Sequence, residues 1–120
     1  MTKGAVLAIG IEPGSADVKA NPDLVRTYIE TQIGRLRALG YDVTTCLIDL
    51  GEAAEAAVSA ALTTKRFDCV VIGAGLRRPP SRLLLFERVI NLVHSLAPQA
   101  RICFNTVPAD TPEAVLRWLE

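Results

Sequence analysis

The sequence has few of the residues that build metal sites and disulfide frameworks. Its 120 residues include three cysteines and one histidine. Cys46, Cys69 and Cys103 lie far apart in apolar segments, without the Cys-x-x-Cys spacing of zinc sites. Their odd number and wide spacing argue against a disulfide framework and a metal centre. We therefore predict three reduced thiols that are buried as small hydrophobic groups.

The sequence also lacks an excess of charge and any long apolar run. Its 13 basic and 13 acidic side chains balance to a formal charge of zero, which argues against the basic surface that nucleic-acid binding requires. No apolar run approaches the ~18 residues of a membrane span, and the N-terminus has no signal-peptide cleavage pattern. We therefore expect a cytoplasmic protein that binds neither nucleic acid nor membrane.

What the sequence does have is a regular alternation of strand-like and helix-like segments. Hydrophobic residues make up 50% of the chain, which is enough for a buried core, and the length fits one domain over residues 1–120. Short apolar runs predict β-strands at residues 5–11, 43–50, 69–73 and 101–105. The first, third and fourth of these are almost continuously apolar, as is typical of strands that are covered on both faces.

Segments with helical periodicity follow each of these strands. We predict helices at residues 22–39, 52–64, 81–96 and 112–120. Asn21 and Thr111 are the expected N-caps of the first and fourth helices, because each is followed by a proline at the first helical position. Gly40 is the expected residue just beyond the end of the first helix.

The order of these elements predicts an α/β fold. Alternating strands and helices form a parallel sheet, because each strand returns to the same edge through a helical crossover. We favour a four-stranded parallel sheet, (βα)4, in the strand order 2-1-3-4, with two helices on each face. This is a shortened flavodoxin-like or Rossmann-like layout. The alternative is a half-Rossmann order, 3-2-1-4.

The favoured topology predicts a binding site at one edge of the sheet. Ligands of open parallel sheets bind beyond the carboxyl ends of the strands, where the strand order reverses. In the favoured order this point lies between the strands at 5–11 and 69–73. The loops that follow them, residues 12–21 and 74–80, are the longest in the chain, and long loops in compact domains often carry function.

Two glycines follow the third predicted strand. Residues 70–75, which include Gly73 and Gly75, resemble the start of a dinucleotide-binding fingerprint, in which glycines let the main chain approach a pyrophosphate at a helix N-terminus. The resemblance ends at Arg78, which stands in place of the third glycine, and at the Pro-Pro pair that follows, which we expect to delay the helix. The alternative is that the glycines only let the chain leave the sheet.

Two neighbouring arginines favour an anionic ligand. Arg77 and Arg78 stand beside the glycine amides, where two guanidinium groups suit a phosphate or a carboxylate. Glu12 and Ser15 of the facing loop complete the predicted pocket, and Asn105 ends the neighbouring strand at the same edge. The alternative is that the two arginines form ion pairs with the acidic residues of the facing loop.

No catalytic constellation can be assembled from the sequence. The patterns of a cysteine phosphatase, a phospho-receiver domain and a Walker phosphate loop are all missing. His94, the one histidine, falls in the last turn of the third predicted helix, where a cation complements the helix dipole. Whether the protein is an enzyme, and whether it uses a cofactor, therefore stay open.

An excess of apolar side chains predicts a second subunit. On the helix at 81–96 the apolar residues span about half of the circumference, interrupted by Arg82, whereas a core face needs a stripe of ~100°. The predicted edge strand at 101–105 is apolar as well, and exposed edge strands favour association. We expect a homodimer formed through this strand or this helix. A non-catalytic homodimeric interaction module is therefore the alternative to a ligand-binding function.

Two segments resemble a group of small bacterial α/β proteins. They are residues 69–77 and 101–118. The resemblance covers nearly the whole chain, and it implies a flavodoxin-like or Rossmann-like fold and a cytoplasmic location. It implies no activity. The functional prediction therefore depends on the residues themselves, which favour an anionic small ligand (phosphate, nucleotide or carboxylate) bound at the carboxyl edge of the sheet.

Overall fold

Parallel strands form the middle layer of the structure, a computed structural model that describes residues 2–14 and 21–119. The strands are β1 (Ala5–Ile11), β2 (Asp42–Ile48), β3 (Cys69–Ile72) and β4 (Arg101–Phe104). They lie in the order β2-β1-β3-β4 and all pair in parallel. The favoured strand order is confirmed, and the half-Rossmann alternative is wrong. β1 and β3 are the central strands, and β2 and β4 are the edges.

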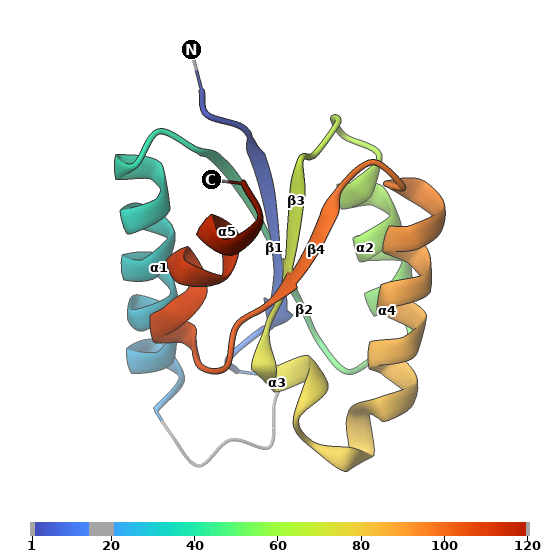
Figure 1. The fold of residues 1–120 in the computed structure, drawn as a ribbon. Helices are drawn as coiled ribbons and strands as arrows, with labels where there is room; N and C mark the ends of the chain where they lie inside the picture. The colour runs from blue at the N-terminus through green and yellow to red at the C-terminus, as the bar shows by residue number, and fades with distance from the viewer. Residues whose placement is uncertain (1, 15–20, 120) are drawn as a thin grey trace.

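Helices cover both faces of this sheet (Figure 1). On one face lie α1 (Pro22–Ala38) and α5 (Thr111–Leu119), and on the other lie α2 (Ala54–Leu62) and α4 (Leu83–Leu96). Three shorter helices lie beyond the strand ends: α3 (Ala74–Arg77), η1 (Pro80–Arg82) and η2 (Pro108–Asp110). The expected pair of helices on each face is confirmed. In the described parts of the chain, no helix is long and apolar enough to cross a membrane.

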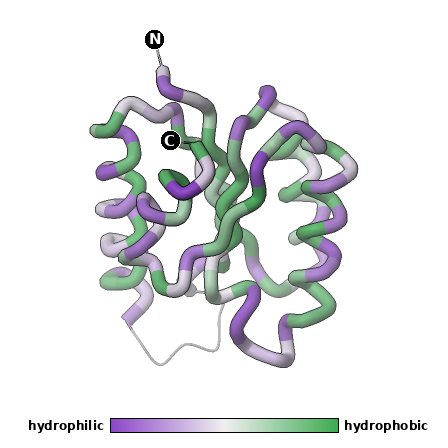
Figure 2. The backbone as a smooth tube through the Cα atoms, viewed as in Figure 1, coloured by the Kyte–Doolittle hydropathy of each residue, from purple (hydrophilic) through white to green (hydrophobic). Residues whose placement is uncertain are grey.

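The sheet has a separate hydrophobic core on each face, because successive side chains of a strand point to opposite sides. In β1, Leu7, Ile9 and Ile11 pack toward α2 and α4, whereas Val6 packs toward α1 and α5. Every residue of β3 is buried. Figure 2 shows the central strands as hydrophobic along most of their length, as expected for strands that are covered on both faces.

Local sequence signals determine where α1 begins and ends. Asn21 Oδ1 accepts a hydrogen bond from Asp23 N at 2.9 Å, and Pro22 occupies the first helical position. Gly40 follows the helix with a φ of +104°, a conformation that glycine adopts without the steric cost of a side chain. Both predicted caps of this helix are confirmed.

Two details of the predicted helix starts are wrong. The long helix α4 follows the Pro-Pro pair at 79–80, as predicted, but the segment before the pair is not a loop, because the single turn α3 begins directly after Gly73. Thr111 is not an N-cap: it has helical angles (φ −56°, ψ −46°), because η2 precedes it and leads into α5. In both places a single helical turn occupies a segment that was predicted as loop, and one turn is too short to show a hydrophobic period. Other element ends shift by one or two residues.

The cysteines are free and buried, as predicted. Cys69 and Cys103 lie on the adjacent strands β3 and β4, and their sulfur atoms are 3.4 Å apart. The hydrogen bond between the two thiols, together with burial, raises the pKa of Cys69. Burial also raises the pKa of Cys46. Both thiols are therefore protonated at neutral pH, which makes them poor nucleophiles.

Candidate functional site

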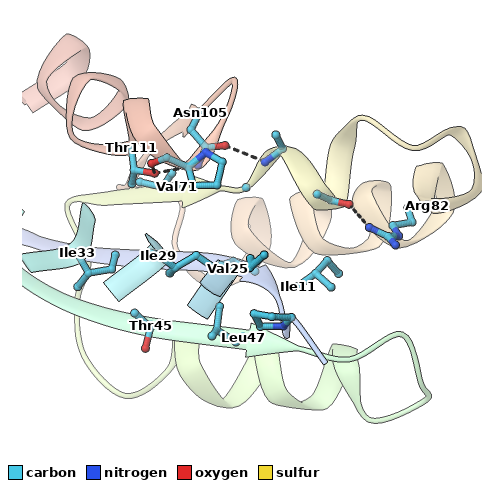
Figure 3. A pocket seen from close by; sticks show the side chains of 18 residues that line it. Ile11, Val25, Ile29, Ile33, Thr45, Leu47, Val71, Arg82, Asn105 and Thr111 are labelled. Carbon is cyan, nitrogen blue, oxygen red and sulfur yellow. Dashed lines mark hydrogen bonds between the residues drawn. The ribbon is translucent and has the colours of Figure 1, made fainter. Parts of the chain in front are cut away.

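A cavity of about 170 Å³ lies between α1 and the sheet, toward the carboxyl ends of the central strands (Figure 3). This is the point where the strand order reverses, which is where the topology predicts a site. Most of the lining is apolar, and α1 contributes Val25, Ile29 and Ile33 to it. The size is similar to that of an engineered apolar cavity of ~150 Å³ that binds benzene.

Small residues leave this space open. On the face of β1 that packs toward α1, Val6 is followed by Ala8 and Gly10, so the side chains become smaller toward the carboxyl end of the strand. Gly73 lines the same cavity directly after β3. A Cβ atom added at Gly10 would have Leu47 Cδ2 as its nearest neighbour, at 3.4 Å. The small side chains of the sheet therefore leave room for the cavity beneath α1.

Asn105 closes one side of the cavity and joins two elements. Its Oδ1 accepts a hydrogen bond from Ala74 N at 2.8 Å, and its Nδ2 donates to Thr111 Oγ1 at 2.9 Å. The Thr111 hydroxyl in turn donates to Pro108 O at 2.8 Å. Asn105 is only 7% exposed, and a buried amide needs such partners. This side chain thus holds the start of α3 against the start of α5, and it occupies the main-chain N–H of Ala74.

Arg77 and Arg78 turn toward the end of β4 and are not part of the cavity lining. Arg77 Nη2 donates to Asn105 O, and its guanidinium carbon lies 5.3 Å from the centre of the Phe104 ring. Arg78 Nη1 donates to Thr106 O at 3.4 Å. The two cations therefore bind main-chain carbonyl oxygens at the end of an edge strand, and Arg77 adds a cation–π contact.

Arg82 is the charged member of the cavity lining within residues 2–14 and 21–119. It belongs to η1, and its Nη1 donates to Gly75 O at 2.6 Å. Figure 3 shows Arg82 at one end of the row of lining side chains, with Ile33 at the other end. None of the ion pairs formed among the described residues includes Arg82.

Glu12 pairs with a residue of α1 that the sequence did not single out. It forms an ion pair with Arg26, and the hydrogen bond and Coulomb attraction between them raise the pKa of Arg26. The main-chain N–H of Glu12 donates to Ile48 O at 2.8 Å, so this residue also extends the pairing of β1 with β2. Ser15, which was predicted beside it, lies outside the described residues.

The structure thus brings together part of the predicted site. Gly73, Gly75 and Asn105 line the cavity, whereas Glu12 and the two predicted arginines lie outside its lining. The apolar wall from α1 was missed, because its residues have the helical spacing of ordinary core positions. A usable signal was present in the sequence. The inner face of α1 carries large side chains, whereas the strand that precedes it carries alanine and glycine at alternate positions.

Comparisons with known proteins add no functional assignment. A scan against protein-family models finds no match, and a search of curated proteins finds no significant relative. Within the described residues there is also no cluster of His, Cys, Asp or Glu side chains arranged to hold a metal ion. The chain is therefore defined by its fold and its site as a small α/β protein with an apolar cavity where the strand order reverses.

Proposed function

We propose that this protein is a small-ligand-binding α/β domain whose ligand occupies the cavity between α1 and the sheet. The observation that supports the proposal is the cavity itself, about 170 Å³ with a mostly apolar lining. Protein interiors are packed densely, and voids larger than a water molecule are few. A ligand would restore the van der Waals contacts that the small residues of the sheet leave unmade.

Binding is favoured over catalysis by the chemistry of the lining. Its polar residues, among those described, are Thr45, Arg82, Asn105 and Thr111. Asn105 and Thr111 are hydrogen-bonded to each other, and among residues 2–14 and 21–119 no carboxylate, thiol or imidazole lies beside them in the lining. Since general acid–base chemistry needs such a pair of groups, we assign the cavity a binding role. A cytoplasmic location is part of the proposal, and the free cysteines support it.

A cavity-filling substitution tests this proposal. Gly10→Val places a branched side chain in the cavity, next to the flexible end of Leu47. We expect toluene to shift the amide NMR signals of residues along the cavity in the wild-type protein and to leave Gly10→Val unchanged. A ligand at one hundred times its dissociation constant also adds ~2.7 kcal/mol of stability, which thermal unfolding detects.

Two further variants complete the test. Val25→Phe fills the same space from α1, where the side chain is only half-buried, and it is the substitute if Gly10→Val does not fold. Gly34→Val changes a glycine of the same helix at which, within the described part of the chain, an added Cβ has no neighbour within 4 Å, so this variant is expected to bind toluene like the wild type. If these amide signals of the wild type do not shift even in a solution saturated with toluene, the proposal is contradicted.

The second candidate function is a homodimeric interaction module. Leu83 and Leu84 at the start of α4 are 57% and 59% exposed, and Trp118 of α5 is 52% exposed. β4 is an edge strand, and apolar surface beside an unpaired edge is typical of association sites. Light scattering on the purified protein at micromolar concentration is expected to give the mass of a dimer, and Leu83→Glu/Leu84→Glu to give a monomer. A monomeric wild type would remove this candidate.

A further inference from the structure

We infer that the ligand of this cavity is a small monocarboxylate with an aromatic or branched aliphatic body, and that Arg82 binds its carboxylate group. The inference rests on the proposed function and goes further, because it names the chemical class of the ligand and the residue that recognises it. It depends on the position of one cation at the end of a mostly apolar cavity.

The Arg82 side chain is held beside Gly75 by one hydrogen bond, which uses one of its five donors. Its Nη1 donates to Gly75 O at 2.6 Å, which anchors one corner of the guanidinium group. A guanidinium group carries five N–H donors, so most of them remain for another acceptor. Gly75 is itself part of the lining, and a Cβ atom there would lie 3.7 Å from Ile11 Cγ1 and 3.9 Å from Arg82 Nη1. Arg82 and Ile11 are therefore both neighbours of Gly75, and both line the cavity.

The other arginines near this edge already have partners elsewhere. Arg26 pairs with Glu12, and Arg77 and Arg78 donate to main-chain carbonyl oxygens at the end of β4. Arg82 is half-buried, yet within residues 2–14 and 21–119 no carboxylate is paired with it. A half-buried cation that forms no ion pair with the described residues is expected to attract an anion, because the surrounding protein screens its charge less than water does.

The charge of the cavity selects a monoanion over a phosphate or a nucleotide. A single guanidinium group can form two parallel hydrogen bonds with one carboxylate and balance its charge. A phosphate carries up to two charges, and the second would lie against apolar side chains without a partner, which is costly. The volume favours a small ligand over a nucleotide, because about 170 Å³ accommodates a body close to the size of a benzene ring.

Paired titrations with phenylacetate and phenylacetamide test the inference. The two probes have the same ring and nearly the same shape, and only phenylacetate is charged. We expect the wild type to bind phenylacetate about tenfold more tightly than phenylacetamide, because charged hydrogen bonds are roughly twice as strong as neutral ones. In Arg82→Gln this preference is expected to disappear, while phenylacetamide binds as before. Affinities are measured by NMR titration at low ionic strength.

Matched variants separate recognition from general effects of charge. Arg78→Gln removes a neighbouring positive charge that lies outside the cavity lining, and it is expected to keep the full preference for phenylacetate. Arg82→Lys keeps the charge but not the planar pair of donors, so its preference is expected to be severalfold weaker than that of the wild type. It also replaces Arg82→Gln if that variant does not fold.

The possible outcomes distinguish the inference from the proposed function. Equal affinities for the two probes in the wild type, with no change in Arg82→Gln, would overturn the carboxylate assignment and leave the cavity as a binding site. Inorganic phosphate that competes with phenylacetate for Arg82 would overturn the choice of a monoanion. If neither phenylacetate, phenylacetamide nor toluene binds to the wild type, so that it behaves like Gly10→Val, the binding function and the inference are both refuted.

Discussion

The two faces of the central sheet are packed differently although they share the same strands. Against α2 and α4, large side chains such as Phe67, Ile72 and Leu76 fill the space and are fully buried. Against α1 and α5, Ala8 and Gly10 of β1 face the helix near the carboxyl end of the sheet, and the cavity lies there. A strand presents alternate residues to its two faces, so one strand can support a filled core and line a cavity at once.

This difference indicates a division of roles. The face against α2 and α4 has the dense packing that is typical of protein interiors, and it is expected to contribute most of the stability. The face against α1 and α5 gives up some of this packing near the carboxyl edge, where ligands of parallel sheets bind. Four measurements test this comparison.

The largest effect on the free energy of unfolding is expected on the face of the sheet that packs against α2 and α4. Phe67→Ala removes a side chain with 0% exposure, and truncation of a buried phenylalanine typically costs ~3–5 kcal/mol. Val25→Ala on the cavity face is expected to cost less than about 1 kcal/mol, because the side chain is half-buried beside space that is already unfilled. Urea unfolding measures both values. Equal losses would mean that the two faces contribute alike.

The second effect concerns the polar side of the cavity. Asn105→Ala leaves the buried N–H of Ala74 without its acceptor and removes the N–H donor to the Thr111 hydroxyl, which still donates to Pro108 O; the loss is expected to cost ~1–3 kcal/mol. Asn91→Ala is the matched control, because its amide donates to Glu87 O on the exposed surface of α4, and we expect a change within about 0.5 kcal/mol. A similar loss for both asparagines would contradict a supporting role for Asn105.

A third measurement compares two glycines with different surroundings. Gly10→Ala adds a methyl group to the cavity, with Leu47 Cδ2 at 3.4 Å, whereas Gly34→Ala adds one in open space on α1. Neither glycine has a positive φ, so each substitution is expected to raise the free energy of unfolding by ~0.4–1 kcal/mol through the unfolded state. Gly10→Ala is expected to gain at least as much as Gly34→Ala. A net loss at Gly10 would show that this position is already tightly packed.

The smallest effect is a pH dependence at the start of α5. Burial acts to raise the pKa of Asp110, but hydrogen bonds from Thr106 and Val107 outweigh it and lower this pKa. The ionised carboxylate thus stabilises the native state at neutral pH, and this contribution is lost as the pH falls from the unfolded value of ~3.9 through the lower folded value.

Asp110→Asn provides the test of this linkage. In acid-range unfolding experiments, the stability of the wild type is expected to fall more steeply below about pH 4 than that of the variant. At neutral pH the variant is expected to be the less stable of the two. Parallel pH profiles would mean that these hydrogen bonds do not favour the ionised form. Because Asp110 lies near the surface, the difference is expected to be small.

Much of the fold could be predicted from local patterns. β1 was predicted with its observed ends, since its apolar run follows Lys3 and Gly4 and ends before Glu12. The cap at Asn21 and the turn at Gly40 are decided by neighbouring residues, so they too were readable. The alternation of strands and helices then left few topologies, because crossovers between parallel strands are right-handed. The edge of the sheet that carries the cavity follows from that topology.

The choice of the cation that lines the cavity could not be predicted in the same way. Arg77, Arg78 and Arg82 lie close together in the sequence, and all three follow the two glycines at positions 73 and 75. Which guanidinium group reaches the cavity depends on the single turn α3 and on the η1 helix after the Pro-Pro pair. Such short turns are held by tertiary contacts, here by the hydrogen bond from Ala74 to Asn105, rather than by their own propensity.

The amino-acid sequence alone was sufficient for the α/β class, the strand order and the edge of the sheet at which the cavity lies, because hydrophobic periodicity and chain connectivity act locally or through a few topological rules. The cavity and its lining depend instead on distant residues that meet on one face of the sheet. Ala8 and Gly10 leave space that matters only because α1 packs over them. The directions of the arginine side chains are likewise set by main-chain carbonyl groups. Arg77 and Arg78 donate to carbonyl groups after β4, and Arg82 donates to Gly75 O in the preceding turn. The chain brings these partners together only when it folds.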